Sequence, residues 1–277
     1  EKKPWLKFYG SVPQSIDYTM VTMYQALMDT AGKYPDTIAY DFLGYTSTYR
    51  RFAEEINKCA DALAAMGLKK GDRVTISMPT SPQGVICFYA VNKLGAVASM
   101  IHPLSPPKEI EFYLNISKSV MALTIDAFYG SFNQVMHKTA CKKLILARIP
   151  DYLGLVKKIG FNLTKGRKIP KVPKDDRVVW WNDMMGGSYP AVKPAVMGPD
   201  EMAVVLYSGG TTGVPKGIML SNYNFISEGL MVAHWGGLDR TSSILAIMPI
   251  FHGFGLGVCV NAAFMGGGKS ILVPTFT

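Results

Sequence analysis

Several features are scarce in this 277-residue chain, and each scarcity excludes a class of protein. No apolar run reaches the roughly eighteen residues that a membrane-spanning helix needs, so the sequence predicts no such helix. Charged residues make up only 18% of the chain and hydrophobic residues 48%, which is typical of a globular protein with a large core and not of a disordered one. The chain also has no internal repeat and no low-complexity segment.

Cysteine is scarce as well. Cys59, Cys87, Cys141 and Cys259 lie far apart, and no CxxC pair exists. A chain of this length does not need disulfide bonds to stabilise its fold, so the sequence predicts four buried free thiols. Free thiols are typical of a reducing compartment, and they therefore indicate a cytoplasmic protein.

Acidic residues are too few to balance the basic ones, and the formal net charge is +9. Most of the excess is local, because residues 152–177 contain eight basic and two acidic residues, a net charge of +6. Nucleic-acid binding is not indicated, since no aromatic interleaving or known binding motif accompanies this patch. The basic residues of the segment are Lys157, Lys158, Lys165, Arg167, Lys168, Lys171, Lys174 and Arg177.

Apolar residues in the same segment follow a helical spacing, and two interpretations stay open. A cationic amphipathic helix can lie on an anionic membrane, where each basic residue contributes about 1 kcal/mol. Alternatively, the segment is a solvated loop whose apolar side chains cover the core of the domain itself. The apolar residues concerned are Tyr152, Leu153, Leu155, Val156, Ile159 and Leu163.

Strand-like and helix-like runs alternate from about residue 37 onward. Strands separated by single helices imply βαβ units, so we predict an α/β fold of mainly parallel sheets flanked by helices. In such sheets, ligands bind beyond the carboxyl ends of the strands. The first half predicts helices at residues 51–66, 82–94 and 107–116, and strands at 73–78, 96–101, 120–125 and 143–147.

The alternation resumes after a Pro- and Gly-rich stretch at residues 186–199, which we interpret as a linker. We predict a first α/β subdomain over residues 1–200, with the basic insert near 152–177, and the beginning of a second over residues 201–277. The pattern ends on a strand without its next helix, so we expect a truncated chain. The second half predicts strands at residues 203–207, 243–248 and 270–273, and helices at 222–234 and 256–265.

A loop rich in glycine, threonine and lysine occupies residues 207–217, between a predicted strand and a predicted helix. Its glycines let the backbone approach a ligand and present N–H groups. Ser208, Thr211 and Thr212 add hydroxyl groups, and Lys216 adds a positive charge. This combination predicts a polyphosphate-binding loop, with an ordinary flexible surface loop as the alternative.

The loop does not fit the GxxxxGK[ST] pattern of P-loop nucleoside triphosphatases. Pro215 stands where that pattern has its second glycine, and Gly217 replaces the Ser or Thr after the lysine. The sequence therefore disfavours that class of enzyme.

Residues 207–217 instead resemble the signature [YF]-[ST]-[SG]-G-[ST]-T-G-x-P-K-G of the adenylate-forming superfamily, which includes acyl-CoA synthetases, luciferase and peptide-synthetase adenylation domains. Gly209 stands where many members have serine. A second family motif, P-x-F-H-x-x-G, is matched at residues 249–255, and a broader likeness covers residues 48–103. The chain most resembles the N-terminal portion of a medium- or long-chain fatty-acid-CoA ligase.

The resemblance implies ATP-dependent activation of a carboxylate, in particular a fatty acid, to acyl-AMP, followed by transfer to coenzyme A. Mg²⁺ would accompany ATP, with Ser208 as a weak candidate ligand, and Lys216 and His252 would be the catalytic residues. The acyl and adenylate pocket would contain His252, Gly253, Phe254 and Gly255. The ATP phosphates would be bound by Ser208, Gly209, Gly210, Thr211, Thr212, Gly213 and Lys216.

His252 also follows a predicted strand directly, which places it at the ligand-facing edge of a parallel sheet. His102, His137 and His234 are interpreted as structural residues.

Two other functions remain open. The protein could be an acyl-AMP ligase or a peptide-synthetase adenylation domain, which passes the acyl group to a carrier thiol. It could also be a non-catalytic nucleotide- or membrane-binding module, because the family's later motifs for adenine, ribose and Mg²⁺ and its C-terminal lysine do not occur in these 277 residues. We therefore expect this chain alone not to form acyl-AMP at a useful rate.

Overall fold

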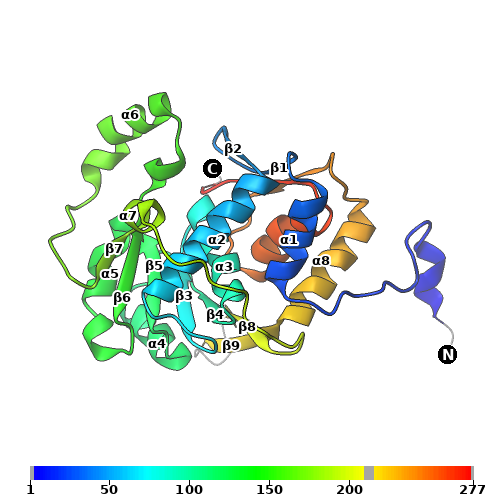
Figure 1. Cartoon of the computed structure of the whole chain (residues 1–277), viewed down its shortest axis with the longest axis horizontal. Helices are drawn as coiled ribbons and strands as arrows, with labels where there is room; N and C mark the ends of the chain where they lie inside the picture. The colour runs from blue at the N-terminus through cyan, green and yellow to red at the C-terminus, as the bar shows by residue number, and fades with distance from the viewer. Residues whose placement is uncertain (1–2, 209–214, 276–277) are drawn as a thin grey trace.

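The computed structural model describes residues 3–208 and 215–275. Two sheets with helices packed on them form the body of the molecule, and the N-terminal arm extends away from it (Figure 1). The predicted α/β fold with mainly parallel sheets is confirmed.

The larger sheet has seven strands in the order β7-β6-β5-β3-β4-β8-β9. All neighbours are parallel except β8 and β9, which form an antiparallel pair. The predicted strand at residues 143–147 has the observed bounds, and the others agree within two residues. The strands are β3 (Arg73–Ser77), β4 (Val97–Met100), β5 (Met121–Ile125), β6 (Lys143–Ala147), β7 (Val178–Trp180), β8 (Met202–Ser208) and β9 (Lys216–Ser221).

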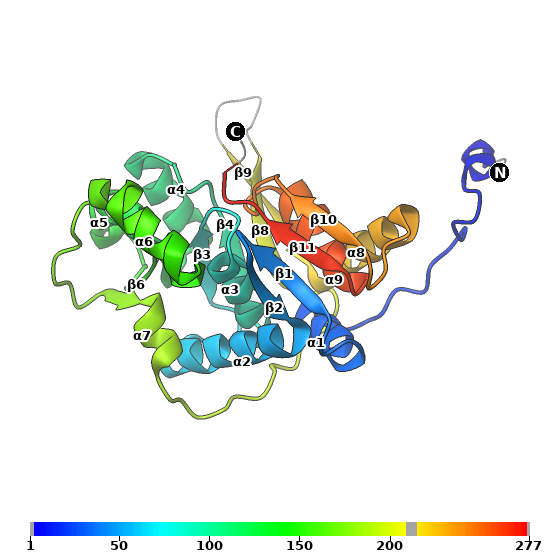
Figure 2. The ribbon, with the colours of Figure 1, turned by 90° about the horizontal axis from the view of Figure 1, so that it is seen from above.

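The smaller sheet joins strands from the two ends of the sequence, in the order β10-β11-β1-β2 (Figure 2). β1 is parallel to β11 and antiparallel to β2. Strand pairing thus crosses residue 200 in both sheets, and the division into subdomains at that residue stays a prediction. The strands are β1 (Ile38–Phe42), β2 (Tyr45–Thr48), β10 (Ser243–Ala246) and β11 (Lys269–Leu272).

Local sequence signals explain where the main helices begin and end. Helix α2 (Tyr49–Ala65) begins after Thr48, whose side chain accepts a hydrogen bond from the Arg51 backbone N–H. It ends just before Gly67, which adopts a φ of 94° that few other residues tolerate. The remaining helices are η1 (Pro4–Phe8), α1 (Met23–Lys33), α3 (Pro82–Lys93), α4 (Pro107–Ser117), η2 (Asp126–Phe128), α5 (Tyr129–Asn133), η3 (Met136–Lys138), η4 (Ile149–Tyr152), α6 (Leu155–Leu163), η5 (Lys165–Lys168), α7 (Trp181–Gly186), α8 (Asn222–Gly236), the π-helical η6 (Phe254–Asn261) and α9 (Ala262–Met265).

The larger of two apolar core clusters connects the two sheets. Every residue of α3 is buried, because this helix packs on α1, α2, β3 and β4. Aromatic rings continue the core from α2 to α9: the Phe52 and Phe264 centroids are 5.2 Å apart, and Tyr89 of α3 lies 6.1 Å from Phe52. Elements before and after the loop at 207–217 are therefore held in one packed unit.

The basic insert carries the predicted helix, but this helix does not bury its apolar side chains. Helix α6 projects from the body of the molecule (Figure 1). Leu155, Val156, Ile159 and Leu163 are 51–83% exposed. The start of the segment does cover the core, where Tyr152 is buried with its ring 5.3 Å from that of Tyr45. For the four α6 residues, the interpretation as core cover is wrong.

Candidate active site

The two ends of the predicted phosphate loop are held side by side. Ser208 at the end of β8 pairs with Lys216 at the start of β9, and Tyr207 pairs with Gly217. The side chain of Lys216 is exposed, whereas its backbone belongs to β9 of the larger sheet. The strand β9 was not predicted from the sequence, which had placed a helix as the next element.

The predicted contacts of the middle of the loop are not tested by the described residues. Gly209, Gly210, Thr211, Thr212 and Gly213 lie outside the described residues, so their part in phosphate binding stays a prediction.

Tyr207 anchors the end of β8, where the loop at residues 207–217 begins. Its hydroxyl hydrogen-bonds that of Ser99 on β4 at 3.0 Å, and its ring lies 4.5 Å from the ring of Tyr113. Burial raises the pKa of the Tyr207 phenol, so the group is neutral. A half-buried, hydrogen-bonded ring at this position holds the first residue of the loop in place.

The second motif, residues 249–255, forms a tight turn packed against α3. Ile250 is buried, and a Cβ added to Gly84 would lie 2.6 Å from its Cδ1. A Cβ at Gly255 would overlap the carbonyl oxygens of Met248 and Pro249, so only glycine fits there. This geometry explains why the motif needs its glycine.

His252 is exposed at this turn, after the end of β10. Its Nδ1 accepts a hydrogen bond of 3.2 Å from the Phe254 backbone N–H. The neutral ring therefore carries its proton on Nε2, where it can donate to a ligand.

A second histidine reaches the same region. His102 follows β4, the neighbour of β8 in the sheet, and its ring lies 4.4 Å from that of Phe251. Its Nδ1 accepts a hydrogen bond of 2.9 Å from the Leu104 backbone N–H. The sequence interpretation of His102 is structural, although this residue follows a predicted strand as directly as His252 does. The strand-end rule was the signal that could have identified it.

A cavity of about 350 Å³ lies where the second motif meets β8 and α8. Of the four residues predicted for the acyl pocket, Gly253 and Phe254 line this cavity and His252 and Gly255 do not, and the assignment of an acyl pocket stays a prediction. A Cβ at Gly253 would lie 3.3 Å from the Leu206 side chain, which shows how closely the turn approaches β8. The cavity is lined by Leu206, Leu220, Asn224, Phe225, Glu228, Gly253, Phe254 and Val258.

Glu228 is the one acidic side chain in this lining, and the sequence analysis did not identify it. Burial raises its pKa to about 7. Its Oε2 atom is sealed from solvent and has no hydrogen-bond partner in the part of the chain that the structure describes. The available signal was a lone carboxylate one turn after Asn224 on a largely apolar helix.

Metal ligands are not gathered near the loop. Across residues 3–208 and 215–275, no three His, Cys, Asp or Glu side chains come together to hold a metal ion. Ser208 as a ligand of Mg²⁺ stays a prediction, and no step proposed below depends on it.

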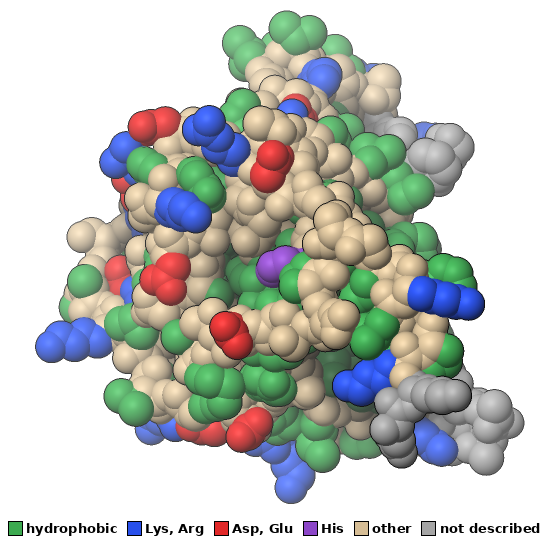
Figure 3. Space-filling view, turned by 90° about the vertical axis from the view of Figure 1, so that its right-hand side faces the viewer, with side chains coloured by type: hydrophobic (Ala, Val, Ile, Leu, Met, Phe, Trp, Pro, Cys, Tyr) green, Lys and Arg blue, Asp and Glu red, His purple; other side chains and the backbone are tan. Residues whose placement is uncertain are grey.

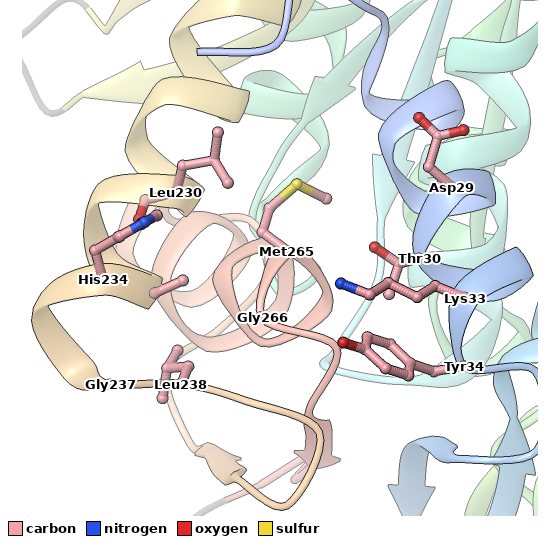
Figure 4. A pocket seen from close by; sticks show the side chains of 11 residues that line it. Asp29, Thr30, Lys33, Tyr34, Leu230, His234, Gly237, Leu238, Met265 and Gly266 are labelled. Carbon is pink, nitrogen blue, oxygen red and sulfur yellow. The ribbon is translucent and has the colours of Figure 1, made fainter. Parts of the chain in front are cut away.

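A second cavity, of about 470 Å³, lies between α1 and α8, away from the two motifs (Figure 4). Lys33 and Tyr34 extend into it from the α1 side, and His234 lies on the α8 side. The face of the molecule that includes α8 has charges of both signs scattered around a central hollow (Figure 3). No residue of either motif lines this second cavity, so the 350 Å³ cavity is the candidate substrate site.

Comparison with known proteins agrees with this choice of motifs. The profile of a family described as AMP-binding enzyme matches residues 27–277. The long-chain-fatty-acid–CoA ligase of Bacillus subtilis (strain 168) is 29% identical over 281 residues, which cover 99% of this chain and 50% of the relative. That of Escherichia coli O6:H1 is 30% identical over 285 residues, which cover 98% of this chain and 50% of the relative.

Solved structures show the same fold. The crystal structure of a long-chain-fatty-acid-CoA ligase from Archaeoglobus fulgidus superposes with a TM-score of 0.79 at 22% identity, over 95% of this chain and 49% of that one. The chain thus spans about half the length of the relatives it matches.

Proposed function

The chain belongs to the AMP-binding enzyme family, and from that premise we propose that the protein containing it activates a fatty acid with ATP and transfers the acyl group to coenzyme A. The observation that carries the proposal is the pairing of Ser208 with Lys216 beside a largely apolar cavity. A cation and a hydroxyl suit a polyphosphate, and an apolar cavity suits an alkyl chain.

In the proposed first step, a carboxylate oxygen of the fatty acid attacks the α-phosphorus of ATP. The bond to the β-phosphate breaks, and acyl-AMP and pyrophosphate form. Lys216 is placed at the base of the loop to neutralise the charge that develops on the leaving pyrophosphate, which is electrostatic stabilisation without proton transfer. Mg²⁺ would accompany ATP, as in other adenylate-forming ligases.

In the proposed second step, the thiol of coenzyme A attacks the acyl carbon, AMP leaves and a thioester forms. His252 would orient the acyl carboxylate and the adenylate in both steps, by donating a hydrogen bond from Nε2. The hydrogen bond that Nδ1 accepts from the Phe254 backbone N–H supports this role, because it sets the tautomer that places a donor on the exposed ring edge.

The alkyl chain of the substrate would enter the cavity beside Gly253 and Phe254. Burying it contributes about 0.8 kcal/mol per CH₂ group, so a chain of several carbons can be held without charged partners. The names of the relatives from Bacillus subtilis and Escherichia coli support a long chain.

Exchange of labelled pyrophosphate into ATP, measured for the full-length protein with a panel of acids, tests this proposal. We expect fatty acids to support exchange and amino acids not to. Exchange with amino acids alone would favour a peptide-synthetase adenylation domain instead. Transfer to a carrier-protein thiol, and not to coenzyme A, would favour an acyl-AMP ligase.

We also propose that the protein works in the cytoplasm and contacts an anionic membrane through residues 152–177. The four cysteines are free and buried, which suits a reducing compartment. Among the described residues, no helix is both long and apolar enough to cross a bilayer. Helix α6 instead exposes apolar side chains beside a basic stretch, the combination with which a helix lies on a membrane surface. A fatty acid partitions into membranes, so this position would bring the enzyme to its substrate.

Co-sedimentation of the protein with vesicles tests the membrane proposal. We expect binding to phosphatidylserine-containing vesicles at low salt and weaker binding at high salt, because salt screens the basic residues. Equal binding to purely zwitterionic vesicles would contradict the electrostatic part of the proposal.

A further inference from the structure

Glu228 is an unexpected residue for a cavity that holds a plain alkyl chain. It comes from the middle of α8, and it shares the cavity wall with Leu206, Phe225 and Val258. A carboxyl group in such surroundings is costly unless it is hydrogen-bonded or neutral. In the described chain, its Oε2 atom is buried without any hydrogen bond.

Among the described residues, no cation is packed around Glu228 to compensate for its charge. The titratable groups whose pKa Glu228 raises are Tyr89 of α3 and Cys259 of η6, and neither is a cation. Tyr89 donates its hydroxyl hydrogen to the Asn261 side chain, at 3.1 Å, and so does not serve Glu228. Desolvation is the single cause of the raised pKa of Glu228.

The fold makes room for this carboxyl group. A Cβ at Gly257 would lie 2.7 Å from Oε2 of Glu228, so the carboxyl occupies the space that a side chain on η6 would fill. Glu228 is therefore packed into the cavity wall and does not point to bulk solvent. A buried polar atom in this position is expected to find its partner in the ligand.

We infer that the cavity accepts an acyl chain that carries a hydroxyl group, and that Glu228 recognises this hydroxyl by hydrogen bonding. The inference rests on the proposed function of the cavity as the acyl site. It adds a substrate class, hydroxylated fatty acids, and a specificity-determining residue.

A hydroxyl fits this site better than an ammonium group. Near neutral pH the carboxyl is partly protonated, so it can both donate to and accept from a hydroxyl. An ammonium group would have to lose its water shell in a cavity where Asn224 and Glu228 are the polar side chains of the lining. A plain alkyl chain would leave the carboxyl unpaired and desolvate it further.

Isothermal titration calorimetry of the full-length protein tests the inference. The ligands are a saturated fatty acid, acids of the same length with the hydroxyl at successive positions, and the matching ω-amino acid. We expect at least one hydroxy acid to bind about tenfold more tightly than the plain acid, as one hydrogen bond to a buried polar group allows. Glu228→Gln keeps this preference because an amide also donates and accepts, and Glu228→Leu abolishes it.

Two further variants make the test decisive. Gly257→Ala displaces the carboxyl without removing it, and it should also weaken the preference, whether or not Glu228→Leu folds. Glu54→Leu, at an exposed position on α2, is the matched control and should keep the preference. The inference is overturned if no hydroxy acid is preferred, if Glu228→Leu keeps the preference, or if the ω-amino acid binds most tightly.

Pyrophosphate exchange in the same proteins separates this inference from the proposed function. If fatty acids support exchange but no hydroxy acid is preferred, the role of Glu228 is contradicted and the proposed activation of fatty acids stands. If a hydroxy acid is preferred in binding but no acid supports exchange, the proposed activation is contradicted and the role of Glu228 in binding stands.

Discussion

Lys216 combines two properties at a single residue: a fixed backbone and a free side chain. The backbone is fixed by pairing with Ser208, while the side chain is exposed. A positive charge with these properties can meet a polyphosphate without reorganising the fold, which is the condition for strong electrostatic stabilisation.

Replacing Lys216 should therefore damage catalysis and spare stability. We expect Lys216→Ala to lower the rate of pyrophosphate exchange by about 10²-fold, the cost typical of one lost electrostatic stabiliser. Thermal unfolding should not change, because the side chain is exposed. Lys69→Ala, at an exposed turn, is the control. Equal exchange rates for the two variants would refute the role of Lys216.

For the substitution Gly255→Ala we predict the opposite effect, a loss of stability. A Cβ there would overlap the carbonyl oxygens of Met248 and Pro249, so Gly255→Ala should lower the free energy of unfolding by about 1–3 kcal/mol. In Gly32→Ala the new Cβ meets nothing within 4 Å, and this helical site should gain about 0.5–1 kcal/mol. Urea unfolding of both variants measures the difference, and equal effects would contradict the geometry of the turn.

Glu228 predicts a pH dependence of stability. Its pKa rises from 4.5 to about 7 on folding, so the folded state binds more protons than the unfolded state between these values. The stability that protonation of Glu228 gives the folded protein is then fully present below about pH 4.5, and it is lost as the pH rises through about 7. Glu228→Gln removes this titration, and it should raise the melting temperature more at pH 8 than at pH 5.

The control for this titration is Glu54→Gln, whose effect on the melting temperature should be the same at both pH values, because Glu54 is exposed. A constant difference between Glu228→Gln and the unsubstituted protein across this range would show that Glu228 is not desolvated.

Single residues were predictable from the sequence only where a motif marks them. His252 and Lys216 belong to motifs; Lys216 begins β9 of the larger sheet, and His252 follows β10 of the smaller sheet. Glu228 has no motif, because its significance comes from a cavity that α8 forms with a turn some 25 residues later in the chain. His102 was recognisable, since the rule that selected His252 applies to it as well.

At the scale of elements, segments with regular periodicity were predicted well, whereas several short strands were not. Helix α2 and strand β6 appear where their apolar patterns place them. Strands β1, β2, β7 and β9 were missed, because these short runs are defined by their pairing with neighbouring strands and not by a local apolar pattern. The linker at residues 187–199 has no regular element, yet the Ala195 N–H donates to the Lys93 carbonyl oxygen and fixes it to α3.

At the scale of elements, we predict that substitutions in helix α6 weaken membrane binding. Leu155→Ser with Val156→Ser should lower partitioning onto anionic vesicles by about tenfold or more, because two exposed apolar side chains no longer insert. The fold should be unaffected, since both residues occupy the first turn of the helix and are 75% and 83% exposed.

Val196→Ser is the matched control, because this valine is 91% exposed in the linker, outside α6. If it lowers vesicle binding as much as the α6 variant does, α6 is not the contact surface.

At the scale of the whole molecule, the order of the strands within the two sheets could not be predicted from the sequence. The parallel pairing of β1 with β11 joins segments more than 200 residues apart, and local patterns contain no information on such pairs. Its consequence is functional. The apolar core shared by both sheets holds β8, α8 and the turn at residues 249–255 in fixed positions around one cavity.

Direct detection of acyl-AMP is the measurement that tests the central proposal. The full-length protein is incubated with ATP, Mg²⁺ and a fatty acid without any thiol, and the products are analysed by mass spectrometry. We predict acyl-AMP and an equal amount of pyrophosphate, both strongly reduced in Lys216→Ala. Formation of ADP and phosphate, or of no acid-dependent product, would contradict the account.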